Sequence, residues 1–180
     1  MASKVVKVVL GVTGSVAVYK AGDIVRRLQD HGCEVRVVMT ACAQKFVTPL
    51  LFEALSGGAV FSDMFSRDFD WDATHVSLAK SNLFLIAPCT ANVIGKIASG
   101  IADDLLTATA MATRAPLLIA PAMNTGMYTS PAVQANLSTL KKRGVVVVPS
   151  KKGRLACGDV GEGALADVDD IVKAALRSLK

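Results

Sequence analysis

Short apolar runs alternate with helix-like stretches along nearly the whole chain, and this alternation constrains the fold more than any other feature. Buried parallel strands are short, almost entirely apolar and rich in β-branched residues, and five runs fit that description: Val5–Leu10, Glu34–Met39, Leu83–Ala87, Leu117–Ala120 and Val145–Val148. A weaker sixth run is Ala59–Phe61. Helical patterns lie between or after them at Ala17–Gln29, Ala43–Ser56, Ala91–Ser99, Asp104–Ala112, Pro131–Lys142 and Val168–Leu179. The alternation predicts an α/β fold with a parallel sheet covered by helices on both faces.

Length and composition favour a globular protein of one domain, residues 1–180, because 52% of the residues are hydrophobic. No apolar run reaches the roughly 18–20 residues that span a bilayer, and the N-terminus enters a strand without a signal peptide, so we expect a cytoplasmic protein without a membrane partner. The net charge of +5 comes from scattered basic residues, which argues against a nucleic-acid partner. Two longer stretches, Ser62–Thr74 and Ser150–Asp167, have no clear periodicity and are predicted to be irregular functional loops.

The cysteines predict neither a metal site nor a disulfide framework. Cys33, Cys42, Cys89 and Cys157 form no Cys-x-x-Cys pair, and none has metal-ligand spacing to a histidine. Free thiols in a reducing compartment are therefore expected. Cys33 and Cys89 lie in apolar runs and are predicted to be core residues.

Asn124 follows an apolar strand directly, in the segment Pro116–Tyr128. Ligands of open parallel sheets bind beyond the carboxyl ends of the strands, so this amide is placed to recognise a small polar group such as a carboxylate. The alternative is an Asx-turn that leads into a helix. The residues alone leave both interpretations open.

The first strand leads into a glycine-containing turn, Gly11-Val-Thr-Gly14-Ser15-Val16. Backbone N–H groups of such a turn and the following helix N-terminus can hold an anion, and the hydroxyls of Thr13 and Ser15 could add donors. The spacing is neither the dinucleotide Gly-x-Gly-x-x-Gly motif nor a Walker A motif, which leaves a mononucleotide such as FMN. A tight turn without a ligand is the alternative.

Polar residues also follow two other strands. Thr40 comes after the second strand, and the fourth is followed by Thr90, Ala91 and Asn92, where Thr90 could cap a helix or meet a phosphate and Asn92 could contact a ring edge. Each signal is weak by itself. Four strand ends rich in Ser, Thr, Asn or Gly on one side of one sheet together predict a ligand site.

Two further residues are candidates for proton transfer. His75 stands between an acidic stretch and the amphipathic segment Val76–Lys80, and an imidazole can act as a base near neutral pH. Cys157 lies in a glycine-bearing Ala-Cys-Gly-Asp loop that could fold over a pocket, where a thiol can donate a proton. A structural histidine and an inert exposed cysteine are the alternatives.

Four motifs in this order resemble the homo-oligomeric, flavin-containing cysteine decarboxylases over nearly the whole chain. They are Gly14-Ser-Val-Ala17, His75, Pro121-Ala-Met-Asn-Thr-Gly-Met-Tyr128 and Ala156-Cys-Gly-Asp159. Within that family, the Ala-Cys-Gly-Asp loop is typical of enzymes that decarboxylate 4'-phosphopantothenoylcysteine to 4'-phosphopantetheine in coenzyme A biosynthesis. Cys42 and Ala43 stand where some relatives have serines, so we do not expect side-chain contacts from these two positions to a cofactor phosphate.

The resemblance implies a single-domain, flavodoxin-like three-layer sandwich assembled into trimers, with FMN between subunits. His75 would be the base of the oxidative decarboxylation, Asn124 would hold the substrate carboxylate, and Cys157 would return a proton in the reductive half. We expect the cofactor to be bound by Gly14, Ser15, Val16, Thr40, Thr90, Ala91, Asn92 and Met123. We expect the substrate to be bound by Asn124, Met127, Ala156, Cys157 and Gly158.

Three other activities share parts of this pattern. A peptidyl-cysteine decarboxylase shares FMN, the histidine and the Asn124 block but lacks the reducing cysteine. A flavin prenyltransferase would need a different phosphate site and no Asn124 block. A non-catalytic regulatory flavoprotein typically has a long acidic tail or lacks a catalytic residue. The sequence leaves open whether the chain is a stand-alone enzyme or one half of a bifunctional decarboxylase–ligase.

Overall fold

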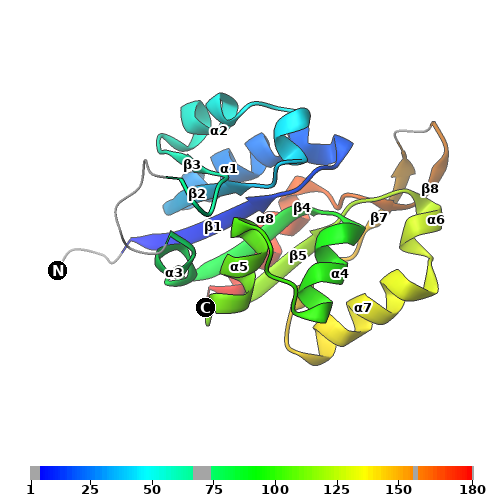
Figure 1. Ribbon diagram of the computed structural model, residues 1–180. Helices are drawn as coiled ribbons and strands as arrows, with labels where there is room; N and C mark the ends of the chain where they lie inside the picture. Colours follow the sequence, from blue (N-terminus) through cyan, green and yellow to red (C-terminus); the bar gives the residue numbers. More distant parts are fainter. Residues whose placement is uncertain (1–4, 67–73, 156–157, 180) are drawn as a thin grey trace.

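The computed structural model describes residues 5–66, 74–155 and 158–179, and its centre is a six-stranded parallel sheet (Figure 1). The strand order is β3-β2-β1-β4-β5-β6. The strands are β1 (Val6–Val12), β2 (Cys33–Met39), β3 (Val60–Phe61), β4 (Leu83–Cys89), β5 (Leu117–Pro121) and β6 (Val146–Val147). The chain leaves β1 for β2 and β3 on one side and returns to β4 on the other, so the order reverses between β1 and β4. Parallel sheets bind ligands at such a reversal, outside the carboxyl ends of the strands.

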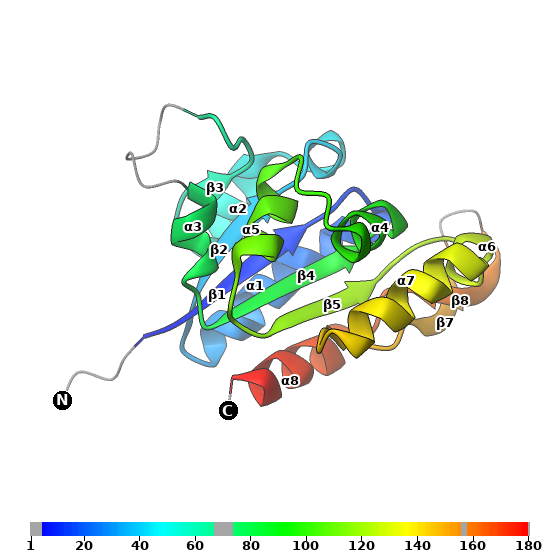
Figure 2. The same cartoon turned by 60° about the horizontal axis from the view of Figure 1, so that its bottom comes forward.

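Helices cover both faces of the sheet, as Figures 1 and 2 show from two directions. One apolar cluster joins β1 residues such as Leu10 to α1 (Ala21–Asp30), α2 (Pro49–Ser56) and α8 (Val168–Ser178). A second cluster joins β4 residues such as Phe84 to the helices of the opposite face, which are α3 (Thr74–Ala79), α4 (Ala91–Ser99), α5 (Leu105–Ala112) and α7 (Pro131–Lys142). Because all seven residues of β4 are buried, this strand is covered on both sides. The predicted flavodoxin-like three-layer fold is confirmed.

The structure contains the predicted helices with two exceptions, and local sequence explains both. Ala43–Ser56 is not one helix but a 3₁₀ turn, η2 (Ala43–Lys45), followed by α2. Thr48 is extended because it precedes Pro49, and a residue before proline is driven out of the helical region. The predicted helix Ala17–Gln29 likewise begins as a 3₁₀ segment, η1 (Val16–Lys20), before α1. Its β-branched Val16 and Val18 have a reduced preference for α-helix.

The prediction that 150–167 is an irregular loop is wrong for half of its length. β7 (Lys151–Arg154) and β8 (Val160–Ala164) form a separate antiparallel pair. These strands consist mainly of glycines and charged residues, so they lack the alternation of apolar and polar residues that predicts a strand. The pair lies beside the short helix α6 (Thr125–Tyr128), at the end of the molecule where the central strands finish (Figure 1).

Candidate active site

The ends of four strands enclose one cavity of about 560 Å³, called the helical cavity below. Its walls come from the turns after β1 and β2, from the start of α4, and from the segment after β5. The residues that line it are Gly14, Ser15, Thr40, Ala41, Cys42, Thr90, Ala91, Asn92, Val93, Lys96, Asp104, Ala122, Met123 and Met127. The structure thus brings together seven of the eight residues predicted to bind the cofactor, all except Val16.

A second cavity of about 350 Å³, the hairpin cavity, lies between η1, the start of α6 and the β7–β8 hairpin. Its walls are Ser15, Val16, Ala17, Tyr19, Lys20, Ala122, Met123, Asn124, Arg154, Leu155, Gly163, Ala164 and Leu165. Ser15, Ala122 and Met123 line both cavities, so the two adjoin. Asn124 stands beside that shared wall. A ligand in one cavity can therefore meet a ligand in the other next to Asn124.

The turn after β1 is shaped by a close approach of two backbones. A Cβ atom on Gly14 would lie 2.5 Å from the Cβ of Cys42, so only glycine fits between the β1 and β2 turns. Ser15 is the N-cap of η1, and its Oγ accepts a hydrogen bond from the N–H of Ala17 at 3.3 Å. This packing keeps the backbone at Gly14–Ser15 on the wall of the helical cavity.

Thr13 does not contribute a hydroxyl to the cavity, so that prediction is wrong. Its side chain is fully buried, donates to the carbonyl oxygen of Pro88 at 2.8 Å and accepts from the N–H of Thr90 at 3.0 Å. The hydroxyl instead ties the end of β1 to the loop after β4. Thr90 occupies the N-cap position of α4, but its side chain makes no capping hydrogen bond there.

Asn124 forms the Asx-turn that the sequence left open and also lies on a cavity wall, where its recognition of a carboxylate stays a prediction. It is the N-cap of α6, and its Oδ1 accepts a hydrogen bond from the N–H of Gly126 at 2.8 Å, as an Asx-turn requires. The same exposed residue lines the hairpin cavity. The Asx-turn fixes the orientation of the amide without removing it from the cavity.

The β7–β8 hairpin is docked onto the segment that carries Asn124. The N–H of Met123 donates to the carbonyl oxygen of Gly163 at 2.9 Å, and the hydroxyl of Thr125 donates to that of Glu162 at 2.8 Å. Gly163 has a φ of +101°, and a Cβ there would lie 2.6 Å from the Met123 oxygen. A Cβ on Gly161 would lie 2.2 Å from Thr125 Oγ1. The glycines that obscured the strands in the sequence are what allow this contact.

Two of the three predicted catalytic residues, His75 and Asn124, do not line a common cavity in the described part of the chain. His75 is half-buried on α3 and is not among the described residues that line either cavity. Figures 1 and 2 both place α3 at the end of the molecule away from α6 and the hairpin. Ala156 and Cys157 lie outside the described residues. Their neighbour Gly158 is exposed, with a φ of +93°, between the two strands of the hairpin.

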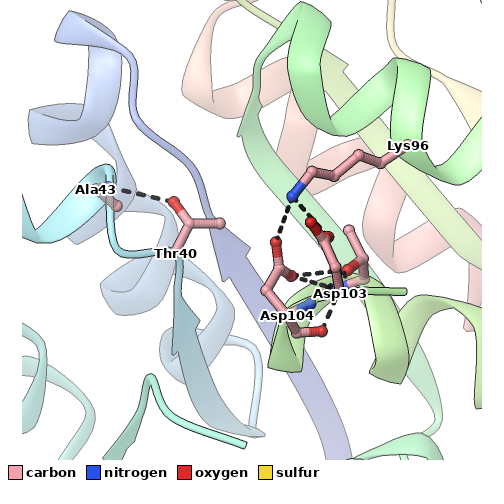
Figure 3. Close-up of polar contacts among 6 residues, drawn as sticks. Thr40, Ala43, Lys96, Asp103 and Asp104 are labelled. Atoms are coloured by element: carbon pink, nitrogen blue, oxygen red, sulfur yellow. Dashed lines mark hydrogen bonds and ion pairs between the residues drawn. The ribbon is translucent and has the colours of Figure 1, made fainter. Parts of the chain in front are cut away.

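Charged side chains on the cavity walls were missed or only loosely indicated by the sequence. Lys20 and Arg154 line the hairpin cavity from opposite elements. In the helical cavity, Lys96 on α4 pairs with Asp103 at 2.7 Å and with Asp104 at 3.1 Å (Figure 3). Across from them, Thr40 Oγ1 accepts from the N–H of Ala43 at 3.2 Å. Lys96 could not be predicted from the residues that follow each strand, because it lies more than one turn into α4.

The environment shifts the pKa values of several groups. Burial raises the pKa of the Asp104 carboxyl, but hydrogen bonds from Thr107 and Lys96 outweigh it and the net pKa is lowered. The hydrogen bond to Asp103 leads the effects that raise the pKa of Lys96. Complete burial raises the pKa of the Cys89 thiol, which fits the predicted core position of this cysteine.

Within the described ranges, no group of three or more His, Cys, Asp or Glu side chains could hold a metal ion. No helix in those ranges is long and apolar enough to cross a membrane.

Curated relatives match this chain over most of its length. A coenzyme A biosynthesis bifunctional protein, CoaBC, of Bacillus subtilis is 47% identical over 169 residues, which is 93% of this chain and 42% of that protein. The chain therefore spans about two-fifths of the length of the bifunctional relatives it matches. A probable phosphopantothenoylcysteine decarboxylase of Streptococcus mutans is 44% identical over 170 residues and is covered to 95%.

Solved structures and a family model agree with these matches. A mutant phosphopantothenoylcysteine (PPC) decarboxylase complexed with pantothenoylaminoethenethiol superposes with a TM-score of 0.85 at 33% identity, covering 97% of both chains. The FMN-dependent cysteine decarboxylase SpaF superposes with a TM-score of 0.84 at 36% identity, again covering 97% of both chains. The family model described as Flavoprotein matches residues 2–180. This chain belongs to the flavoprotein family.

Proposed function

We propose that this protein is an FMN-dependent decarboxylase that converts 4'-phosphopantothenoylcysteine to 4'-phosphopantetheine in the cytoplasm. The observation that carries the proposal is the position of Asn124 beside the shared wall of the two adjoining cavities. One cavity has the turn and the apolar walls that a flavin mononucleotide needs. The other has an amide and two cations suited to a substrate with a carboxylate and a phosphate. The names of the matched relatives support the same activity.

The helical cavity fits FMN in size and chemistry. Its volume of about 560 Å³ lies within the usual range for cofactor sites. The backbone at Gly14–Ser15 and the start of η1 would hold the phosphate, because N–H groups at a helix start attract anions. Ala91, Val93, Ala122, Met123 and Met127 provide apolar surface for the ring. When bound, FMN would supply the two-electron oxidation and later reduction of the substrate.

The hairpin cavity fits the substrate. Asn124, oriented by its hydrogen bond to Gly126, would donate its amide N–H groups to the substrate carboxylate. Lys20 and Arg154 would attract the phosphate at the other end of the molecule. Holding the carboxylate beside the shared wall presents the cysteine part of the substrate to the flavin, because both cavities meet there.

His75 would act as the base only if it came from a neighbouring copy. Within one chain it lies on α3, away from both cavities. A homo-oligomer, as the resemblance implies, would allow α3 of one subunit to approach the cavities of the next. Mixing His75→Ala subunits with Asn124→Asp subunits, each expected to have little activity by itself, under conditions of exchange should restore activity. Continued inactivity of the mixture, with exchange verified by mass, would show that His75 serves its own chain or has no such role.

Cys157 would supply the proton that completes the product. A Cys157→Ser variant should release a compound two hydrogens lighter than 4'-phosphopantetheine, because decarboxylation would proceed and the final reduction would not. Together with the reduced product expected from the wild type, this result separates the proposed activity from a peptidyl-cysteine decarboxylase, which ends at the oxidised product. Normal product at the normal rate would remove Cys157 from the mechanism.

The direct test is incubation of the purified, flavin-loaded protein with 4'-phosphopantothenoylcysteine. The expected result is a product lighter by one CO2, identified by mass spectrometry. A cysteine-terminated peptide serves as the control substrate and should remain unchanged. Failure to bind FMN, or loss of CO2 from the peptide alone, would contradict the proposal.

A further inference from the structure

A lysine held by two carboxylates forms part of the wall of the helical cavity. Lys96 projects from α4, whereas Asp103 and Asp104 immediately precede α5 (Figure 3). Lys96 Nζ lies 2.7 Å from Asp103 Oδ1 and 3.1 Å from Asp104 Oδ2. The Lys96 side chain is only 20% exposed, and both Lys96 and Asp104 line the cavity. A cofactor in this cavity would bury the lysine further.

The two carboxylates fix the position of the ammonium group. Asp104 is itself anchored, because its Oδ1 accepts from the N–H of Thr107 at 2.8 Å as the N-cap of α5. Its other oxygen is thereby directed toward Lys96. Ordering a free lysine side chain costs rotamer entropy when a ligand binds, and this arrangement has already ordered it. The hydrogen bond to Asp103 also raises the pKa of Lys96, which keeps it charged.

One donor of the ammonium group is left for a ligand. An ammonium has three N–H groups, and two of them are donated to Asp103 and Asp104. In the part of the chain that the structure describes, no side chain or carbonyl accepts the third. Since Lys96 lines the cavity, an acceptor on a bound molecule can take that hydrogen bond.

The net charge of the cluster indicates which part of the cofactor it meets. One ammonium and two carboxylates sum to a charge of −1, so the cluster repels a dianionic phosphate. The phosphate already has a suitable place at the Gly14–Ser15 turn, which carries no acidic side chain. A neutral acceptor, such as a carbonyl oxygen of the flavin ring, can receive the hydrogen bond without that repulsion.

Resting on the proposed binding of FMN, we propose that Lys96 is a cofactor-contacting residue that donates to the flavin ring, with Asp103 and Asp104 as positioning residues. Reduction places additional electron density on the ring. A positive N–H donor beside the ring therefore stabilises reduced FMN more than oxidised FMN, and the two carboxylates moderate this preference. The charge balance of the cluster sets how readily the bound flavin accepts electrons.

The test compares the dissociation constants of oxidised and reduced FMN for the full chain freed of flavin. Oxidised FMN is titrated by fluorescence quenching, and reduced FMN is titrated anaerobically. Lys96→Met should weaken the binding of reduced FMN by about tenfold to a hundredfold, the range for one hydrogen bond to a charged group. It should weaken oxidised FMN less. Lys96→Arg, which retains the charge, should recover most of the lost affinity for reduced FMN. Asp103→Asn removes a negative charge and should strengthen the binding of reduced FMN relative to oxidised FMN.

The alternatives give different results. Equal weakening of both redox forms would place Lys96 at the phosphate, whose charge does not change on reduction, and would overturn the proposal. Unchanged constants would show a purely structural ion pair and would overturn it too. If Lys96→Met does not fold, judged by circular dichroism, the double variant Lys96→Met/Asp103→Asn takes its place, because it removes one of the two carboxylates that the lysine no longer pairs with. Failure of the wild-type chain to bind FMN would instead contradict the proposed function.

Discussion

The backbone N–H of Met123 and the carbonyl oxygen of Gly163 lie 2.9 Å apart and join the segment after β5 to the hairpin. Met123 lines both cavities, and Asn124 follows it in the chain. The contact is between backbones, and it places the hairpin at the site because Gly163 has no side chain in the way. The hairpin is consequently part of the wall of the hairpin cavity.

Gly163→Ala should disrupt this docking. The residue has a φ of +101°, and the new methyl group would lie 2.6 Å from the Met123 carbonyl oxygen. Strain of this kind costs about 1–3 kcal/mol, so the hairpin should detach and turnover should fall while the central sheet remains folded. Limited proteolysis within 151–164, together with turnover, measures the effect. Gly153→Ala is the control, since its Cβ would meet the Ala164 Cβ only at 3.4 Å; equal proteolysis of both variants would contradict the docking model.

Thr13→Val should destabilise the fold through hydrogen bonding alone. Valine has nearly the same shape, but it leaves the Pro88 oxygen and the Thr90 N–H without their buried partner. The expected loss is about 1–3 kcal/mol in the free energy of unfolding, measured by urea denaturation. Thr13→Ser retains the hydroxyl and should lose less. Equal stability of the valine variant and the wild type would show that the hydroxyl is not needed there.

Asn124→Asp should abolish most decarboxylation while leaving α6 intact. An aspartate accepts from the Gly126 N–H as the asparagine does, so the helix keeps its N-cap. Its negative charge would face the substrate carboxylate, and we expect an increase in KM together with a loss of kcat. Steady-state kinetics measures both. Asn124→Ala, which removes the amide without adding charge, should retain more activity; the reverse order would argue against a carboxylate at this position.

The Lys96–Asp104 region should make stability depend on pH in the acid range. The pKa of Asp104 is lowered in the folded state, so its ionised form stabilises the fold above the pKa of an unfolded aspartate. That stabilisation is lost as the pH falls through the folded pKa. Asp104→Asn preserves the N-cap but removes the titration. The decrease in unfolding free energy as the solution is acidified from neutrality should therefore be smaller for this variant than for the wild type, and an equal decrease would assign the acid sensitivity to other groups.

Sequence reasoning predicted the sheet well, because buried strands such as β4 are short, apolar and bounded by polar residues. It also located most of the helical cavity, since the carboxyl ends of parallel strands must converge. It failed where a contact depends on how distant segments pack. Thr13 was expected to face a ligand, but the loop after β4 takes its hydroxyl. Similarly, no local pattern indicates that Lys96 will meet two aspartates at the start of the next helix.

The glycines of β8 hold the base of the hairpin independently of the residues that connect its two strands. Gly161 and Gly163 leave room for the base of the hairpin to pack against Thr125 and Met123, where two hydrogen bonds hold it. These contacts lie on β8 itself and place no demand on which side chains follow Arg154. Substitutions between Arg154 and Val160 should therefore leave the docking of the hairpin intact, so the base of the hairpin tolerates variation in the residues it carries.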